Sequence, residues 1–147
     1  MPTGAKLVAA IALALAAFGV SGVVSFRFEV LEHQGGVSGG LFALIGGIIG
    51  WMRLGPAADI SYGRAWATGV GGAFATYFII VLAASTHYVY RGLGFHAYKD
   101  VDALVNGFFK KTFEYAMYIF DWQVLAATIV GGLLAGIFAG FAGRLWT

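Results

Sequence analysis

The chain has 147 residues, of which 60% are hydrophobic and only 11% are charged. Soluble domains average about 25% charged residues, so this composition excludes an ordinary soluble domain. The net charge of +2 gives no basis for a nucleic-acid partner, and the absence of cysteine excludes disulfides, thiolate metal sites and iron–sulfur clusters.

Long runs without an ionisable side chain divide the chain. They cover residues 7–26, 35–52, 65–85 and 122–143. Each run is close to the ~20 residues that a helix needs to cross a bilayer. None of them alternates apolar and polar residues as the strands of a membrane barrel do. The sequence therefore predicts an all-α membrane protein with four transmembrane helices in a single integral membrane domain, residues 1–147.

The first span is expected at residues 5–25. Its apolar run continues to Phe26, which is longer than the core of a signal peptide, so we expect it to be retained. The second span is expected at residues 37–53. Pro56 is expected to end this helix, because proline lacks an N–H donor and clashes with the preceding turn. The third span is expected at residues 64–90.

Residues 100–121 have a different pattern, with apolar and polar residues on separate helical faces. The apolar positions are Val101, Leu104, Val105, Phe108 and Phe109, and the polar ones are Asp102, Asn106, Lys110 and Glu114. A charge at the bilayer centre costs about 2.5–3.5 kcal/mol, so the charges argue against a span. We expect an amphipathic helix that lies on the membrane surface or caps the bundle. The alternative is an extramembrane extension of the last span, residues 122–146.

Aromatic residues support these boundaries. The four tryptophans all fall near predicted helix ends, as expected for membrane-interface anchors: Trp51, Trp66, Trp122 and Trp146. Tyr115 and Tyr118, together with nearby phenylalanines, are also interpreted as an interfacial anchor. If the long segment before the last span is discounted, the lysine and arginine distribution favours cytoplasmic termini.

Small residues recur at every fourth position of the last span. One stripe holds Thr128, Gly132, Gly136 and Gly140, and its neighbour holds Gly131, Ala135, Ala139 and Gly143. A related pair in the second span is Gly46 and Gly50. Residues four apart share a helix face, and small side chains let backbones approach closely in lipid. These GxxxG-like faces predict tight packing, either between the chain's own helices or against another protein or a flat cofactor.

Few residues suggest chemistry. The histidines His33, His87 and His96 fall on one predicted side, so His33 and His96 are candidate metal ligands, but no spacing such as HExxH is present and polar loop residues are the alternative. Ala83 lies four residues before His87, a spacing that also occurs in antenna helices that ligate bacteriochlorophyll; a histidine near the headgroups is the alternative. We expect no enzyme, no catalytic residues and no cofactor other than bound lipid.

Several stretches of the sequence stand out together: MPTGAKLVAA, IIGWMRLG, SYGRAWATG, FFKKTFEYA and GGLLAGIFAG followed by GRLW. In this order they resemble the TrgA-type tellurite-resistance proteins of alphaproteobacteria. The resemblance covers nearly the whole chain in order and spacing. It implies a small multi-pass protein of the bacterial inner membrane that is associated with resistance to the tellurite oxyanion, and it brings no catalytic residues.

These features lead to two main functional hypotheses, beside a membrane enzyme that only the acidic and histidine-rich side supports. The first is a non-enzymatic accessory or structural subunit that packs against a larger respiratory or photosynthetic complex. Its partners would be membrane lipids and other integral membrane subunits or a second copy, with the glycine face of the last span as the main contact. The alternative is a tellurite or oxyanion transporter or channel. The polar side chains available inside the spans for such a path are Ser21, Ser38, Thr68, Thr76, Tyr77 and Thr128.

Overall fold

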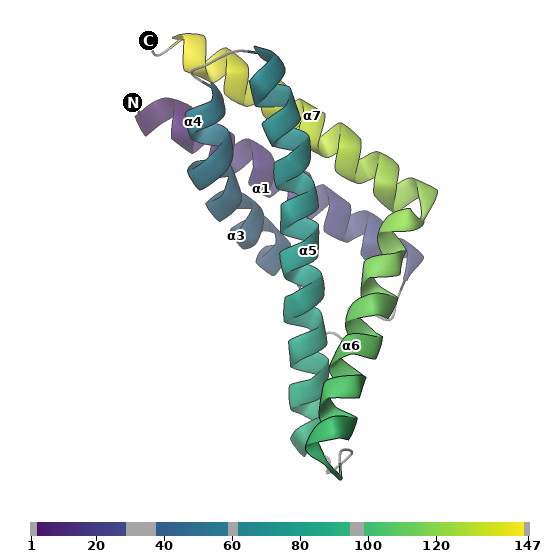
Figure 1. The fold of residues 1–147 in the computed structure, drawn as a ribbon. Helices are drawn as coiled ribbons and strands as arrows, with labels where there is room; N and C mark the ends of the chain where they lie inside the picture. Colours follow the sequence, from purple (N-terminus) through teal and green to yellow (C-terminus); the bar gives the residue numbers. More distant parts are fainter. Residues whose placement is uncertain (1–2, 29–37, 59–61, 95–98, 146–147) are drawn as a thin grey trace.

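The computed structural model describes residues 3–28, 38–58, 62–94 and 99–145. These residues are helical with short connections and contain no strand, as Figure 1 shows. The elements are α1 (Thr3–Arg27), α3 (Gly39–Ile49), the π-helical turn η1 (Gly50–Leu54), α4 (Gly55–Ala58), α5 (Tyr62–Gly94), α6 (Val101–Met117), the 3-10 turn η2 (Tyr118–Phe120) and α7 (Trp122–Leu145). The predicted all-α fold is therefore confirmed.

Four stretches in the described residues are long and apolar enough to cross a membrane. They are Gly4–Arg27, Gly39–Ala57, Gly63–Gly94 and Trp122–Leu145. The chain is therefore a multi-pass membrane protein, and the predicted spans correspond to these four helices. In Figure 1, α1 and α7 lie side by side, α5 crosses them, and both termini lie at the same end of the molecule.

The second span does not end where the sequence predicts. The helix continues through a π-helical turn, in which the N–H of Gly55 donates to the carbonyl of Gly50, and α4 carries it past Pro56 to Ala58. The prediction that Pro56 ends the helix is wrong. Proline needs no hydrogen-bond acceptor, and the wider π turn just before it relieves the clash that its ring would meet in a regular α-helix.

The amphipathic segment forms a helix of its own. α6 ends at Met117, and after η2 the backbone of Asp121 is extended, with φ −63° and ψ 128°. The alternative of a continuous extension of α7 is therefore excluded. α6 packs against α5. Figure 1 shows that α6 runs antiparallel to the second half of α5, so that the two form a helical hairpin. At about 1.5 Å per residue, the 33 residues of α5 span about 50 Å, well beyond a ~30 Å hydrocarbon core.

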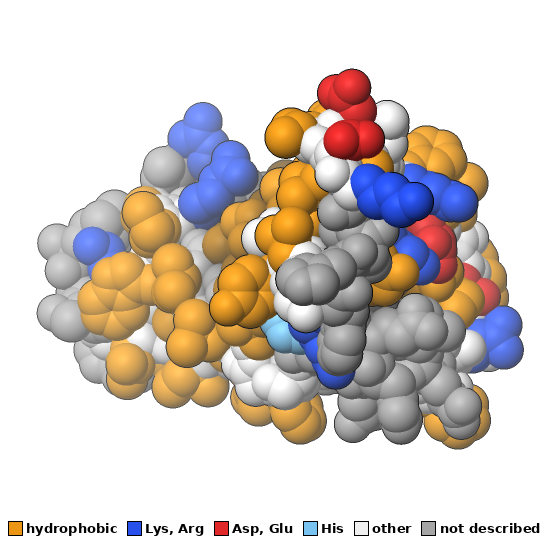
Figure 2. All heavy atoms as spheres, turned by 90° about the horizontal axis from the view of Figure 1, so that it is seen from below, with side chains coloured by type: hydrophobic (Ala, Val, Ile, Leu, Met, Phe, Trp, Pro, Cys, Tyr) orange, Lys and Arg blue, Asp and Glu red, His pale blue; other side chains and the backbone are white. Residues whose placement is uncertain are grey.

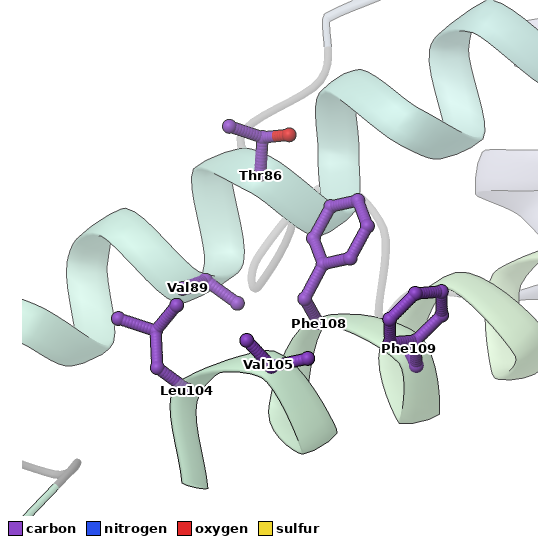
Figure 3. A pocket seen from close by; sticks show the side chains of 6 residues that line it. All are labelled: Thr86, Val89, Leu104, Val105, Phe108 and Phe109. Carbon is purple, nitrogen blue, oxygen red and sulfur yellow. The ribbon is translucent and has the colours of Figure 1, made fainter. Parts of the chain in front are cut away.

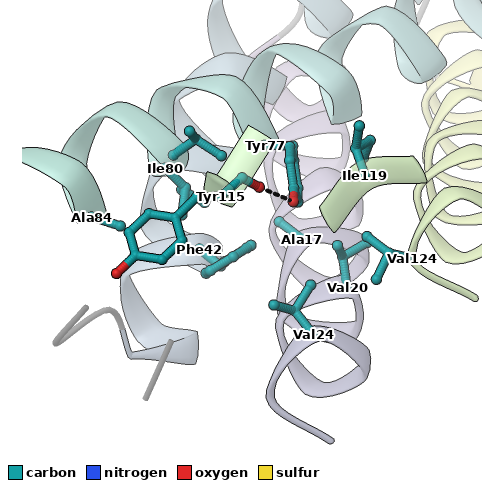
Figure 4. Close-up of a cluster of buried hydrophobic side chains, with 11 residues drawn as sticks. Ala17, Val20, Val24, Phe42, Tyr77, Ile80, Ala84, Tyr115, Ile119 and Val124 are labelled. Carbon is teal, nitrogen blue, oxygen red and sulfur yellow. Dashed lines mark hydrogen bonds between the residues drawn. The ribbon is translucent and has the colours of Figure 1, made fainter. Parts of the chain in front are cut away.

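Two clusters of buried side chains form the core. The first lies where α1, α3, α5, α6 and α7 meet and includes Tyr115 (Figure 4). The second gathers around Leu13, nearer the chain termini, and consists mainly of alanine, leucine and isoleucine side chains. The first cluster ties α6 to the spans, so the position of the hairpin is set by the bundle.

Candidate functional site

The small-residue stripe of the last span lies where α7 crosses α5. A Cβ atom added to Gly136 would lie 2.7 Å from the carbonyl oxygen of Ala65, and one added to Gly132 would lie 2.7 Å from the Cα of Val70. A Cβ on Gly69 would overlap the carbonyl oxygen of Gly132. The two backbones are thus in direct contact, and α5 fills the face that Gly132 and Gly136 present.

The other small residues are also used within the chain. α7 also buries Thr128, Ala135, Ala139, Gly140 and Gly143 within the bundle. On α3 and η1, a Cβ on Gly46 would lie 2.8 Å from the carbonyl oxygen of Leu13, and one on Gly50 would lie 2.6 Å from that of Ala9. Packing inside the bundle therefore leaves no free surface at Gly46, Gly50, Gly132 or Gly136 on which a partner could dock.

One part of the small-residue surface stays open. A groove of about 250 Å³ runs between α1 and α7, and it is lined by Ala12, Leu15, Ala16, Gly131, Leu134, Ala135 and Phe138. Its floor is made of small residues, while Leu15, Leu134 and Phe138 are exposed along its walls. This groove is shaped for an apolar occupant.

The serine and threonine hydroxyls buried in the spans are bonded to their own helices. Thr76, Ser85 and Thr128 each donate to a carbonyl oxygen four residues earlier, at 2.8 Å. Ser21 donates to the Phe18 carbonyl at 2.6 Å. Such bonds satisfy the hydroxyls locally, so these side chains do not line a shared polar path.

Lys111 on α6 forms an ion pair with Glu114 and lies beside two tyrosine rings. Its ammonium donates to Glu114 at 2.8 Å and lies 4.8 Å from the ring centre of Tyr88 and 5.7 Å from that of Tyr115. The hydrogen bond to Glu114 raises the pKa of Lys111. The lysine therefore stays charged, while Glu114 and the rings compensate its charge beside the membrane spans.

A second ion pair joins the end of α1 to the start of α7. Arg27 donates to Asp121 at 3.1 Å, and the other carboxylate oxygen of Asp121 accepts the N–H of Gln123 at 3.0 Å, as a helix N-cap does. Next to it, the rings of Phe28 and Tyr118 stack at 4.1 Å. These contacts hold α1, η2 and α7 together at the junction where they meet.

Low pH is expected to weaken the ion pair at this junction. The hydrogen bond from Arg27 lowers the pKa of Asp121 below its ordinary value. A carboxylate with a lowered pKa stabilises the fold fully above its unfolded-state pKa, about 3.9, and this contribution is lost as the pH falls through the lowered value. Thermal unfolding in detergent between pH 7 and pH 3 should therefore show a smaller fall in Tm for Asp121→Asn, which keeps a capping oxygen, than for the wild type. Equal falls would contradict the pairing.

The anchors and histidines occupy varied positions. Trp51, Trp66 and Trp122 are exposed, as lipid-facing or interfacial rings are, but Tyr115 is fully buried. The interpretation of Tyr115 as an interfacial anchor is therefore wrong, because the first core cluster encloses its ring. Trp146, His33 and His96 lie outside the described residues.

No described residue builds a metal centre. His87 lies exposed on α5, and within residues 3–28, 38–58, 62–94 and 99–145 no three histidine or acidic side chains come together. The pigment-ligand reading of His87 stays a prediction.

A second apolar groove, of about 330 Å³, lies between α5 and α6 (Figure 3). Its lining residues are Thr86, Val89, Leu104, Val105, Phe108 and Phe109. Thr86 adds little polarity, because its hydroxyl donates to the carbonyl oxygen of Leu82 at 2.8 Å. Sequence periodicity indicates the apolar face of α6, but the groove appears only when α5 is placed beside it.

No family model, curated protein or solved structure matches the chain. The resemblance to tellurite-resistance proteins therefore stays a prediction.

Proposed function

We propose that the chain is a non-enzymatic accessory or structural protein of a bacterial inner membrane, which packs against the subunits of a larger respiratory or photosynthetic complex. The resemblance to TrgA-type proteins supports this setting. On this proposal, tellurite resistance follows indirectly from the state of that complex.

The closed interior of the bundle is the observation that carries the proposal. α5 and α7 meet through their backbones at Gly69, Gly132 and Gly136, and the buried serine and threonine hydroxyls of the spans are bonded to their own helices. An interior of this kind holds helices together and offers little to a hydrophilic solute. It favours a role in packing over a role in transport.

The α1–α7 groove is the contact surface that we propose for the partner. Association of helices in lipid depends on close packing, and small residues permit it. Ala12, Ala16 and Gly131 form a small-residue floor between two membrane helices. A transmembrane helix of a partner subunit would pack there on small residues, as α5 packs on Gly132 and Gly136 of α7.

The test is purification of the native protein in a mild detergent, followed by native electrophoresis and mass spectrometry. We expect an identified respiratory or photosynthetic subunit to migrate with the chain in fixed stoichiometry. Ala12→Phe, which fills the groove, should release that subunit. Ile11→Phe is the matched control, because Ile11 is exposed on the same helix outside the groove, and should retain it. Migration of the wild type alone would contradict the proposal.

The alternative function is an oxyanion transporter or channel, which rests on the tellurite resemblance. A transporter requires a polar path through the spans. The buried serine and threonine hydroxyls of the described spans do not supply one, because each donates to a carbonyl of its own helix. Tellurite flux into proteoliposomes separates the two proposals. Flux above that of empty vesicles would favour the transporter, and flux equal to theirs would favour the accessory subunit.

A further inference from the structure

The apolar surface of α6 is wider than α5 can cover. Leu104 and Phe108 point toward α5 and line the groove, while Tyr115 is buried in the core. A second apolar stripe, at every fourth residue, stays exposed: Val101, Val105, Phe109, Phe113 and Met117. Phe109 and Phe113 are 65% and 69% exposed, which is far more than a helix in water would leave open without a reason.

α5 carries a matching exposed stripe. Phe78, Leu82, Thr86 and Tyr90 follow one another at four-residue spacing and are all exposed. Residues four apart share a face, so this stripe runs along one uninterrupted helix from the middle of the span to its far end. Thr86 lies in the wall of the α5–α6 groove. The lipid-facing side of the span therefore continues without a break into the groove.

Polar side chains occupy another face of the hairpin. Asp102, Asn106 and Lys110 are exposed on α6, offset by one position from the apolar stripe. In Figure 2, acidic and basic side chains lie close to one another, with hydrophobic side chains between and beside them. Because acidic and basic side chains are mixed, attraction to an anionic surface contributes little, and apolar burial is the main force available.

We propose that the α5–α6 hairpin lies in the lipid and that the groove between its helices holds an acyl chain. The occupant is lipid because the groove is continuous with the exposed face of a membrane span, and that face meets acyl chains where the span crosses the hydrocarbon core. Phe120 in η2 and Trp122 at the start of α7, which follow α6, are also exposed, and an exposed tryptophan suits the headgroup level. An amphipathic helix in this position buries its apolar face and keeps its polar face toward the headgroups.

Site-directed labelling tests the position of the hairpin. The chain has no cysteine, so single cysteines can be introduced into the full-length protein without background. Nitroxide labels at Val105, Phe109 and Phe113 report the apolar stripe, and labels at Asn106 and Lys110 are matched controls on the same helix. In phosphatidylcholine vesicles, we expect the first three to collide mainly with oxygen, which concentrates in lipid, and the controls mainly with a water-soluble nickel chelate.

Other patterns of collision would overturn the proposal. Equal access of the nickel chelate to all five labels would place the hairpin in water. Labels on the apolar stripe that neither reagent reaches would show that protein covers it, and spin–spin broadening would identify a second copy of the chain.

Photocrosslinking tests the groove itself. A benzophenone amino acid in place of Val105, which lines the groove, is expected to give an adduct with phosphatidylcholine that mass spectrometry detects. The same amino acid in place of Asn106 should give none, because that position faces away. Equal adducts at both positions, or an adduct at neither, would contradict an acyl chain in the groove. These tests need no partner subunit, so they can fail or succeed independently of the proposed accessory role.

Discussion

Replacing Gly136 with leucine is expected to push α5 away from α7 and to destabilise the whole bundle. A Cβ at this position would already lie 2.7 Å from the carbonyl oxygen of Ala65 and 2.8 Å from the Cα of Trp66. These are backbone atoms, which cannot turn aside as the end of a flexible side chain can. Overpacking usually costs about 1–3 kcal/mol, and leucine adds three more carbons beyond the Cβ, so we expect a loss at or above the upper end.

The measurement is the Tm of the purified protein in detergent, together with the fraction that elutes as a folded species. Gly69→Ala and Gly71→Ala provide a matched pair on α5. Both gain the same helix propensity, but a Cβ on Gly69 meets the backbone of α7, while a Cβ on Gly71 has no neighbour within 4 Å. Gly69→Ala should lower Tm and Gly71→Ala should not. If the two variants behaved alike, the α5–α7 crossing would not be as close as described.

Replacing Tyr115 with alanine is expected to have the second large effect. Tyr115 is fully buried in the first core cluster, and its carbonyl oxygen accepts a hydrogen bond from the Tyr77 hydroxyl at 2.9 Å (Figure 4). Removal of a buried aromatic ring leaves a cavity and costs about 3–5 kcal/mol. Because the ring ties α6 to α1, α3 and α5, the loss should appear as detachment of the hairpin as well as a lower Tm.

Tyr115→Phe separates the ring from its hydroxyl. Among the described residues the Tyr115 hydroxyl is buried without a hydrogen-bond partner, and burial raises the pKa of Tyr115, so the group stays neutral. Removing a buried polar group that has no partner leaves nothing unsatisfied. The phenylalanine variant should therefore be as stable as the wild type or more stable, in a thermal scan run beside Tyr115→Ala. A loss as large as that of the alanine variant would show that the hydroxyl has a partner.

Local sequence was sufficient for the parts of this protein that depend on one helix at a time. The length of each apolar run predicts a span because the hydrocarbon core has a fixed thickness. The spacing of Val101, Val105 and Phe109 predicts an amphipathic helix because helical periodicity is set by the backbone. Both predictions are met by α6 and by the four long apolar helices.

The end of the second span needed more than a local rule. Proline usually ends a helix, but a π-helical turn before Pro56 lets the chain continue to Ala58. At this turn η1 packs against α1, and Gly50 contacts the backbone at Ala9. The sequence contains Gly50 and Pro56 but does not show that contact.

Tertiary structure alone decided which surfaces are filled and which remain open. The glycines at positions 132 and 136 predict that another backbone comes close, and the fold shows that this backbone is that of α5. Tyrosine is a residue type that is common at membrane interfaces, yet Tyr115 is buried where five helices converge. The physical reason is the same in each case: periodicity determines which residues share a face, whereas the partner of that face depends on contacts between helices far apart in the sequence.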